Sequence, residues 1–518
     1  MWETATVNLT HHTCGLFLAV ALPLLHAQES TTSWGPWRPT GESAAVNPVE
    51  QQSTRGTDRS SRDSGHGPTG GFRTEVPGHP YDIVLGRPTR TSVTISVLSY
   101  PDATVQVHYG TNPEVYPETT DLIRVSAGAV REIAVTGLQA NTRYYYRLVH
   151  RRSDDGEREA ALAEGTFHTQ RPAATPFTFT IQADSHLDEN TEPTLYAQAL
   201  RNARADEPDF HIDLGDTFMT GKYGRRHEDA LPQYMAQRYY FSLLCHSAPL
   251  FLVLGNHDGE TDGRVTAAIR MRTKYFPNPT PNSFYTGSPE QIDGVGPAQN
   301  YYAWEWGDAL FVVLDPFRYT AEERGRRKSD NWGRTLGKEQ YGWLRNTLES
   351  STVPFKFVFV HHLVGGLDRN ARGGVEAATL YEWGGRDPNG DETFSQHRPG
   401  WQMPIHDLLV RNGVDIVFHG HDHFFARQEL DGITYQLVPQ PGHPGTRRPR
   451  YAEEYGYAQG DILGGAGHIR VRVGPEQVRV EFVQVSAATR PGPLSGSAAA
   501  VFSYTVPSAV PHRAAGRP

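Results

Sequence analysis

Five short polar motifs in the sequence contain side chains that can bind metal ions. They are Asp184-Ser-His186, Gly215-Asp216, Gly255-Asn-His-Asp258, His361-His362 and Gly420-His-Asp-His423. Carboxylate, imidazole and amide oxygen ligands suit borderline or hard metals such as Zn, Mn, Fe or Co, and they do not form a soft thiolate site. Because a carboxylate can bridge two cations, two metals about 3.5–4 Å apart can clamp a phosphate and activate a water between them. The residue types therefore predict two-metal hydrolysis.

Each motif follows an apolar run that is typical of a buried strand. The runs cover residues 177–181, 210–214, 249–254, 355–360 and 414–418. Helical patterns lie between several of them, over residues 194–205 and 230–244. Alternating strands and helices indicate an α/β architecture, in which functional groups collect at the carboxyl ends of the strands. We therefore expect the five motifs to lie together in one site.

The ordered set D-x-H, G-D, G-N-H-D, H-H and G-H-x-H resembles the calcineurin-like metallophosphoesterases over residues of about 177–485. The resemblance implies a central β-sandwich flanked by helices, and two divalent or trivalent metal ions (Fe, Zn or Mn). It implies that Asp216 bridges both ions. The first metal would be held by Asp184, His186, Asp216 and His423, and the second by Asp216, Asn256, His361 and His421. For any one of these residues alone, a capping, turn or core role is the competing interpretation.

Two further residues carry a catalytic role by the same resemblance. His257 is similar to the family's non-ligand histidine, which would protonate the leaving oxygen or stabilise charge on the phosphoryl group. Asp258 would orient His257 or serve as a turn residue at the strand end. His361 is chosen as ligand over His362 because the family's motif often reads His-His-Pro with the first histidine as ligand, although Leu363 replaces that proline. The nucleophile would be a hydroxide bound by both metals, attacking phosphorus in line without a phospho-enzyme.

Loops supply the candidate substrate contacts. These contacts are Asn256, His257, His362 and Arg372. Arg372 lies in a long polar insert, residues 363–400, and could bind phosphate oxygens; an ordinary solvated loop charge is the competing interpretation. The resemblance implies a phosphomonoesterase that acts on a small-molecule phosphate ester. A phosphodiesterase or nucleotide pyrophosphatase would use the same metal set. A non-catalytic surface-binding protein on a degenerate phosphoesterase fold would have lost ligands, yet every expected position is occupied.

Residues 78–170 have a different texture, with alternating apolar and polar residues at 93–97, 104–108, 131–135 and 143–149. Short turns separate these runs, which predicts an all-β sandwich. Residues 138–147 resemble the tyrosine-corner segment of fibronectin type III-like domains. Downstream, residues 468–473 and 477–485 flank a hairpin signal that closes the phosphoesterase domain, 177–485. The remaining residues, 486–518, predict a C-terminal tail with a possible edge strand at 502–506.

This two-domain layout resembles the purple acid phosphatases, whose N-terminal domain is fibronectin-like. Those enzymes use a tyrosine shortly after the Gly-Asp pair to bind ferric iron. Here Thr217, Phe218 and Met219 follow Asp216, and His186 stands where the purple enzymes have no histidine. The sequence therefore predicts a colourless enzyme in which His186 takes the place of the tyrosine.

The N-terminus indicates export. Residues 14–25 form an apolar run with the length of a signal-peptide core, and Ala27 offers a cleavage point, which predicts a signal peptide over 1–27. No Lys or Arg precedes the run, and a buried strand or helix is the alternative. Residues 28–77 are polar and poor in aliphatic residues, which predicts a disordered linker. The protein is thus expected to be secreted or periplasmic, with no integral membrane segment after signal cleavage.

Charge and cysteine content limit the function further. The 518 residues carry a formal net charge of −9, and they contain no long basic run, so we expect no nucleic-acid partner. Of the 2 cysteines, Cys14 falls in the predicted signal peptide. Cys245 lies on an apolar helix face, which favours a buried structural thiol over a reactive one.

Overall fold

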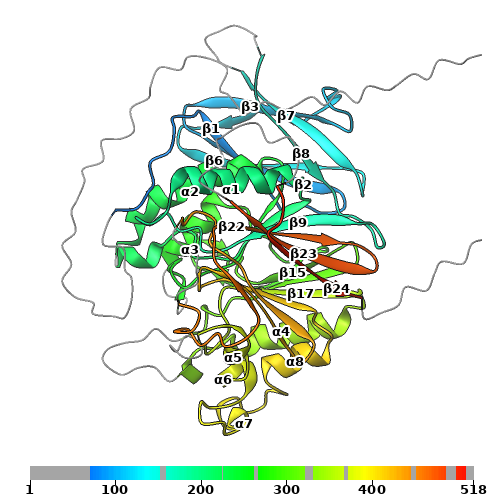
Figure 1. Cartoon of the computed structure of the whole chain (residues 1–518). Coiled ribbons are helices and arrows are strands. Elements are labelled where there is room, and N and C mark those ends of the chain that lie inside the picture. The colour runs from blue at the N-terminus through cyan, green and yellow to red at the C-terminus, as the bar shows by residue number, and fades with distance from the viewer. Residues whose placement is uncertain are drawn as a thin grey trace, which may run out of the picture.

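The computed structural model describes residues 71–151, 159–224, 226–261, 266–320, 331–366, 372–444, 451–485 and 498–508. The predicted signal peptide and most of the predicted linker lie outside these residues. In Figure 1 an N-terminal β-sandwich lies above a larger domain of two stacked sheets with helices on their outer sides. The structure thus has the expected order of an all-β N-terminal region followed by a domain of sheets flanked by helices.

The N-terminal sandwich consists of two antiparallel sheets. One has the order β1-β2-β6, and the other has the order β4-β3-β7-β8 with β5 beside β3. The bounds are β1 (Tyr81–Gly86), β2 (Ser92–Ser99), β3 (Ala103–Gly110), β4 (Glu118–Thr119), β5 (Ile123–Val125), β6 (Ala129–Thr136), β7 (Arg143–Arg151) and β8 (Glu159–His168). Alternate residues such as Val93, Ile95 and Val97 are buried between the sheets, as the period of two requires. The Gln139 N–H donates to the Tyr144 hydroxyl (2.8 Å), the contact that a tyrosine corner makes.

The larger domain stacks two mixed sheets. The first contains β11 (Leu250–Leu252), β10 (Phe210–Asp213), β9 (Phe177–Gln182), β22 (Gly467–Val473), β23 (Gln477–Gln484) and β24 (Phe502–Pro507), in that order. The second contains β12 (Thr286–Gly287), β15 (Tyr302–Trp306), β16 (Ala309–Val313), β17 (Phe355–Val360), β18 (Ile416–His419), β20 (Ile433–Leu437), β19 (Phe425–Leu430) and β21 (Asp461–Leu463). A small hairpin pairs β13 (Gln291–Ile292) with β14 (Gly296–Pro297).

The five strands that precede the polar motifs are divided between these two sheets. In the first sheet β10 pairs in parallel with β9 and β11, and in the second β17 pairs in parallel with β18. Parallel pairing brings the carboxyl ends of each set to one edge. The site is therefore built from two sheet edges that face each other.

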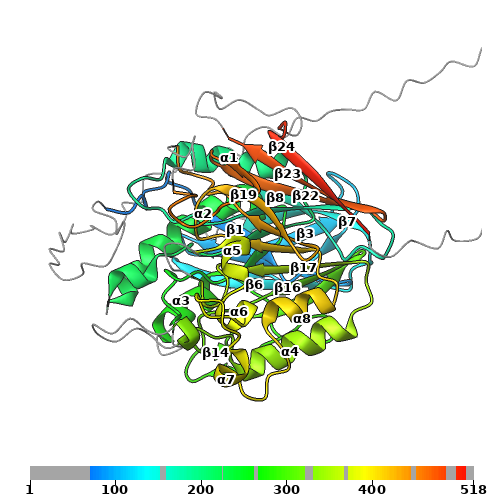
Figure 2. The ribbon, with the colours of Figure 1, turned by 60° about the horizontal axis from the view of Figure 1, so that its bottom comes forward.

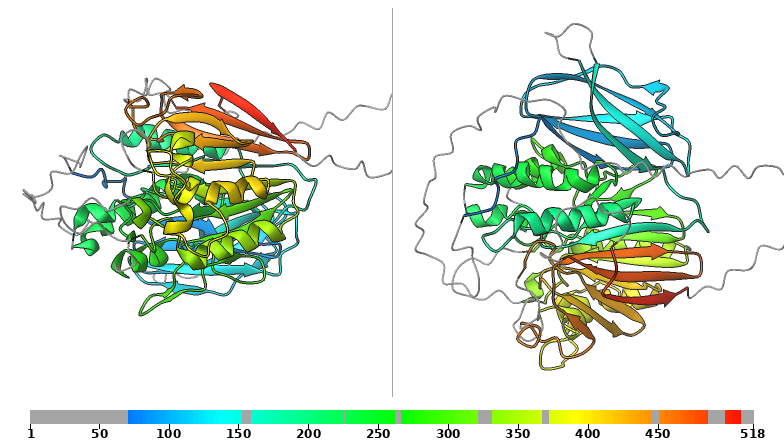
Figure 3. Two further views of the ribbon diagram at one scale, coloured as in Figure 1. Left: turned by 90° about the horizontal axis from the view of Figure 1, so that it is seen from below. Right: turned by 45° about the horizontal axis from the view of Figure 1, so that its top comes forward.

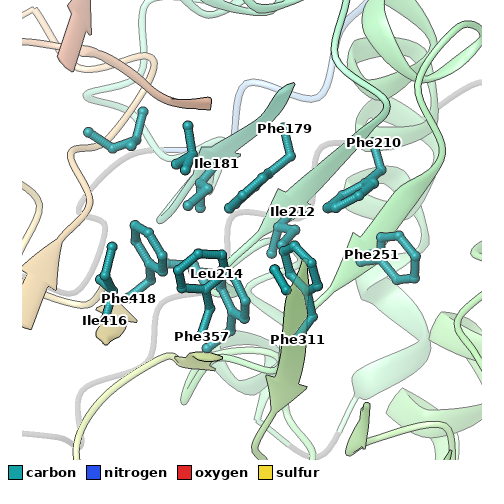
Figure 4. Close-up of a cluster of buried hydrophobic side chains, with 14 of the residues drawn as sticks. Phe179, Ile181, Phe210, Ile212, Leu214, Phe251, Phe311, Phe357, Ile416 and Phe418 are labelled. Atoms are coloured by element: carbon teal, nitrogen blue, oxygen red, sulfur yellow. The ribbon is translucent and has the colours of Figure 1, made fainter. Parts of the chain in front are cut away.

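Aromatic side chains fill the space between the two sheets. Figure 4 shows Phe179 and Phe210 from the first sheet lying against Phe311, Phe357 and Phe418 from the second. All five are fully buried. Burial of one such ring stabilises the fold by about 1.5–3 kcal/mol. This packing fixes the spacing of the sheets, and so the spacing of the loops at their edges.

Helices cover the outer faces. On the first sheet lie α1 (Pro193–Ala205), α2 (Leu231–Cys245) and α3 (Thr266–Tyr275), the first two where the sequence predicts helices. On the second lie α4 (Gly337–Ser350), α5 (Gly374–Ala378), α6 (Tyr381–Gly384) and α8 (Ile405–Arg411), with α4 beside α8 in Figure 2. The short α7 (Phe394–His397) lies between α6 and α8 in the chain and has no buried residue. Short 3-10 turns are η1 (Thr220–Tyr223), η2 (His227–Ala230) and η4 (Asn331–Gly333). Within the described ranges no helix combines the length and the apolar character needed to cross a membrane.

The insert expected as a polar loop, residues 363–400, contains α5, α6 and α7. It folds because it carries its own apolar side chains: Val375 and Trp383 are buried under the second sheet. The Trp383 indole N–H donates to the Tyr435 hydroxyl on β20 (2.9 Å). Its polar composition concealed this packing.

The two domains meet along α2. Arg238 of α2 is fully buried, and its guanidinium donates to the carbonyls of Asp82 (3.0 Å) and Ser96 (2.9 Å) in the sandwich and of Tyr275 (2.8 Å) at the end of α3. Figure 3 shows α1 and α2 between the sandwich and the sheets. Cys245, the last residue of α2, is also fully buried, as the sequence predicts.

Candidate metal centre

Sharp turns at the strand ends bring the predicted ligands together. Asp184, Asp216, His421 and His423 all have positive φ, at 56°, 53°, 80° and 67°. This left-handed region is uncommon for residues other than glycine and often marks functional sites. Gly255 is required because a Cβ there would lie 1.9 Å from the Asp216 amide nitrogen. The loops after β10 and β11 therefore touch, and only glycine allows this approach.

The first group of ligand atoms comes from Asp184, His186 and His423. His423 Nε2 lies 3.3 Å from Asp184 Oδ1. The Nε2 atoms of His186 and His423 also face each other at 3.3 Å. Three potential donors from the loops after β9 and β18 thus converge on one point.

The second group comes from Asp216, His361 and His421. His361 Nε2 lies 3.3 Å from Asp216 Oδ2 and 3.0 Å from Asn256 Oδ1. The same Nε2 is 4.0 Å from Asp184 Oδ1 of the first group. The two groups are therefore adjacent, and all seven residues predicted as ligands lie in or against them.

The donor atoms fit metal ions. Among the described residues, the buried atoms Asp184 Oδ1 and His421 Nδ1 have no hydrogen-bond partner. His361 Nδ1 lies 2.8 Å from the Leu214 carbonyl, which only a protonated Nδ1 satisfies, so Nε2, 3.3 Å from Asp216 Oδ2, is the ring nitrogen left to bind a metal ion. Two facing imidazole nitrogens, as in His186 and His423, repel unless a proton or a cation lies between them. Buried donors with this arrangement can hold the cations that the sequence predicts.

The electrostatics of the cluster also favour positive charge. Burial alone would raise the pKa of Asp216, but the rings of His361 and His257 hold it well below the usual carboxyl value. Burial lowers the pKa of His361, yet the carboxylates of Asp216 and Asp184 outweigh it and raise that pKa to about 10. A cation in the same place would take the role of the His361 proton.

Backbone groups fix the carboxylates. Asp184 Oδ2 accepts from the His421 N–H (2.8 Å), and Asp216 Oδ1 accepts from the His257 N–H (2.7 Å). Each carboxylate therefore has one oxygen committed to the backbone and the other directed into the cluster. This arrangement connects the loop after β9 to the loop after β18, and the loop after β10 to the loop after β11.

The two predicted catalytic residues occupy different positions. The His257 side chain is 31% exposed, and its Nε2 lies 4.0 Å from Asp216 Oδ2. Burial lowers the pKa of His257 to about 4. Asp258 is buried, and its oxygens accept from the backbone N–H groups of Thr217, Phe218 and Gly255 at 2.8–2.9 Å. In the described chain, its hydrogen bonds connect the two loops and do not reach the His257 ring.

The other two substrate candidates, His362 and Arg372, contact different neighbours of His421. His362 is buried, with its ring 5.4 Å from that of His421 and 5.0 Å from that of Phe317. Its Nδ1 lies 3.0 Å from the Leu363 carbonyl. Arg372 is half-buried, and its Nε donates to Asp422 Oδ1 (2.6 Å), between the ligands His421 and His423.

Several supporting residues were not anticipated from the sequence. Asp188 Oδ2 lies 3.1 Å from His186 Nδ1, and the Asp-x-His-x-Asp spacing could have indicated this pair. Gln440 Nε2 approaches His186 Nε2 at 3.4 Å. Buried Asp213 accepts from Gln182 and Thr217 behind the loop that carries Asp216. The Gln440–His186 and Gln182–Asp213 contacts join segments far apart in the chain and have no local signal.

The side chains of Thr217 and Phe218, which follow Asp216, contact residues outside the two ligand groups. The Thr217 hydroxyl donates to Asp213, and the Phe218 ring stacks on Tyr234 of α2 at 4.2 Å. Phe218 thus belongs to the apolar layer under α2.

Comparison with known proteins identifies relatives of this arrangement. Residues 177–425 match the family model described as calcineurin-like phosphoesterase. Purple acid phosphatase 15 of Arabidopsis thaliana is 22% identical over 373 residues, which cover 66% of this chain and 59% of that protein. Purple acid phosphatase 23 of the same plant is 22% identical over 334 residues, which cover 61% and 60%. The chain therefore spans less than two thirds of the length of these curated relatives.

Solved structures share the fold. The structure of PhoD superposes with a TM-score of 0.57 and 16% identity, over 84% of this chain and 91% of that chain. Purple acid phosphatase PPD1 from yellow lupin (Lupinus luteus) seeds superposes with a TM-score of 0.53 and 15% identity, over 83% and 74%. At these identities the likeness concerns the fold, including the N-terminal sheet region.

Proposed function

From the premise that residues 177–425 form a calcineurin-like phosphoesterase domain, we propose that the protein is a metal-dependent phosphoric ester hydrolase, and most specifically a phosphomonoesterase. The observation that carries the proposal is the adjacency of the two ligand groups. His361 Nε2 lies 3.3 Å from Asp216 in one group and 4.0 Å from Asp184 in the other. Two adjacent cation sites can bind the oxygens of one phosphate ester at the same time.

The proposed centre holds two divalent or trivalent ions, drawn from Fe, Zn and Mn. Asp184, His186 and His423 would hold the first, Asn256, His361 and His421 the second, with Asp216 between them. Bound metals supply Lewis acidity toward a phosphoryl oxygen and toward water. Imidazole and carboxylate donors without thiolate support this choice of metals.

His257 is the proposed proton donor or charge-stabilising group. Its ring is partly exposed, unlike the buried ligand His361, so it can reach a phosphate placed over the cluster. Asp258 supports it indirectly, because its hydrogen bonds hold the backbone on both sides of the Asp216–His257 contact. Asn256 and His362 are proposed to face the phosphoryl oxygens.

Export is proposed on the sequence of residues 1–27, and so is a secreted or periplasmic location. The N-terminal sandwich is proposed to be fibronectin type III-like, which the Gln139–Tyr144 contact supports. A small-molecule phosphate ester, rather than nucleic acid, is the proposed partner. N-terminal sequencing of the mature exported chain would test the cleavage after Ala27.

Hydrolysis assays combined with metal analysis test the central proposal. Full-length protein, gently purified, should contain about two metal ions per chain and should hydrolyse nitrophenyl phosphate faster than bis-nitrophenyl phosphate. A chelator should remove the activity, and each metal restored in turn should identify the active pair. Faster hydrolysis of the diester would replace the monoesterase by a phosphodiesterase. Less than one ion per chain would contradict the two-metal centre.

A further inference from the structure

Asp422, the third residue of the Gly420-His-Asp-His423 motif, accepts hydrogen bonds at both carboxylate oxygens. Oδ1 accepts from Arg372 Nε (2.6 Å), and Oδ2 accepts from the Tyr457 hydroxyl (2.7 Å). Asp422 is 4% exposed, and its two chain neighbours are the candidate ligands His421 and His423. The side chain between the two histidines is thus fixed from outside the cluster.

The backbone around Asp422 needs such support. His421 and His423 both have positive φ, a strained conformation that persists only where the surroundings impose it. Asp184 Oδ2 holds the His421 N–H from the metal side. Arg372 and Tyr457 hold the Asp422 side chain through its two carboxylate oxygens.

Both partners of Asp422 are themselves fixed. The Arg372 guanidinium lies 4.4 Å over the Tyr455 ring, and its backbone N–H donates to the Tyr455 carbonyl (3.1 Å). A Cβ on Gly373 would lie 2.5 Å from the Tyr457 hydroxyl oxygen and 2.8 Å from Asp422 Oδ2. The start of the α5–α7 insert and the segment 451–457 therefore meet on this one carboxylate.

We propose that Arg372 and Tyr457 are positioning residues that hold Asp422, and through it His421 and His423, in metal-binding geometry. This inference rests on the proposed function and assigns Arg372 a task other than contact with substrate. Partners that orient metal ligands from behind commonly change metal affinity or activity by about 10–100-fold when they are removed. The latch, meaning Arg372, Asp422 and Tyr457, would therefore control metal retention.

The test measures metal affinity and substrate affinity separately in the full chain. Tyr457→Phe and Arg372→Met should each weaken Zn²⁺ or Mn²⁺ binding about 10–100-fold in competition with a chelator dye. At saturating metal, the KM for nitrophenyl phosphate should equal that of the wild type, and most of kcat should return. Arg372→Lys should lie between Arg372→Met and wild type, because it keeps the charge and loses the planar contact with Tyr455.

Arg427→Met is the matched control. Arg427 lies on the neighbouring β19, 4.7 Å over the Tyr504 ring, and pairs with Asp461 at 3.3 Å, so it repeats the stacked ion pair without touching Asp422. Its metal affinity should be that of the wild type.

Two results would overturn the latch. One is a KM raised tenfold or more in Arg372→Met with unchanged metal affinity, which would make Arg372 a substrate contact. The other is unchanged metal affinity in Tyr457→Phe, a substitution small enough to fold even where Arg372→Met does not. Failure of the wild-type protein to bind metal would instead reject the proposed function, and the latch with it.

Discussion

At the scale of single residues, His257 and Asp216 divide the proposed chemistry. Asp216 is buried, with one oxygen on the His257 N–H and the other 3.3 Å from His361. His257 is the more exposed of the two. A residue that binds a cation is best buried, whereas a residue that acts on the substrate has to reach it. This difference separates the effects that substitutions should have.

His257→Asn should lower kcat for nitrophenyl phosphate about 10²–10⁴-fold, because it removes the group proposed to assist the leaving oxygen. The metal content should stay at the wild-type level, since the His257 side chain belongs to neither ligand group. Steady-state kinetics combined with metal analysis checks both parts. Turnover equal to that of the wild type would show that His257 takes no part in the reaction.

Asp188→Asn should weaken metal binding about 10–100-fold, because it removes the carboxylate that orients His186 from behind. Burial lowers the pKa of His186, and Asp188 together with Asp184 and Asp216 outweighs burial and raises that pKa. Chelator competition gives the affinity. Asp391→Asn, an exposed change in the α6–α7 connection, serves as control. Equal affinity in both variants would argue against the pair.

At the scale of elements, the loop after β10 directs the side chains that follow Asp216 to partners outside the ligand groups. Thr217 bonds to Asp213 and Phe218 stacks on Tyr234, so neither occupies a ligand position. We predict that the iron-loaded protein shows no tyrosinate charge-transfer band at about 500–560 nm. An absorption spectrum of the metal-loaded protein is sufficient to check this. A purple preparation would mean that another tyrosine reaches the cluster.

Sequence patterns predicted some elements well and others not at all. Apolar runs that end in polar motifs predicted β9, β10 and β17, and the alternation of apolar and polar residues predicted β2 and β3. The aromatic strands β15 and β16 were not anticipated, because strands buried on both faces lack a period of two and these end in no ligand.

The same limit applies to the site. The grouping of Asp184, Asp216 and His361 at neighbouring strand ends could be predicted from the order of their motifs in the chain. The contact between Arg372 and Asp422 could not, because it joins residues that are 50 positions apart. For Asp258 the sequence leaves two roles open, orienting His257 or serving as a turn residue, and its hydrogen bonds go to backbone N–H groups of the two loops. Contacts of this kind depend on how the loops pack.

At the scale of the whole molecule, the sandwich and the phosphoesterase domain share buried groups. Arg238 reaches Asp82 and Ser96 in the sandwich. The Tyr285 hydroxyl also donates to the Pro88 carbonyl of the sandwich, and Tyr146 of the sandwich donates to the His246 carbonyl (2.7 Å). A boundary that contains buried hydrogen bonds is expected to unfold together with both domains.

Arg238→Met should therefore lower the free energy of unfolding by about 3 kcal/mol, because it leaves buried carbonyl oxygens unpaired. Urea unfolding followed by fluorescence and by circular dichroism measures this. Arg201→Met, an exposed change on α1, should alter stability by less than about 0.5 kcal/mol. A wild-type protein that unfolds in two separate steps would show that the domains are independent.

The position of Cys245 at the end of α2 makes its thiol a reporter of how often this boundary opens. Its thiol is fully buried, and burial raises its pKa far above the ordinary value, so it is protected from alkylation in the closed molecule. Iodoacetamide can label it only during the fraction of time that α2 separates from its neighbours. The labelling rate at Cys245, measured by peptide mass spectrometry, would thus report the opening equilibrium of the boundary under native conditions, without denaturant.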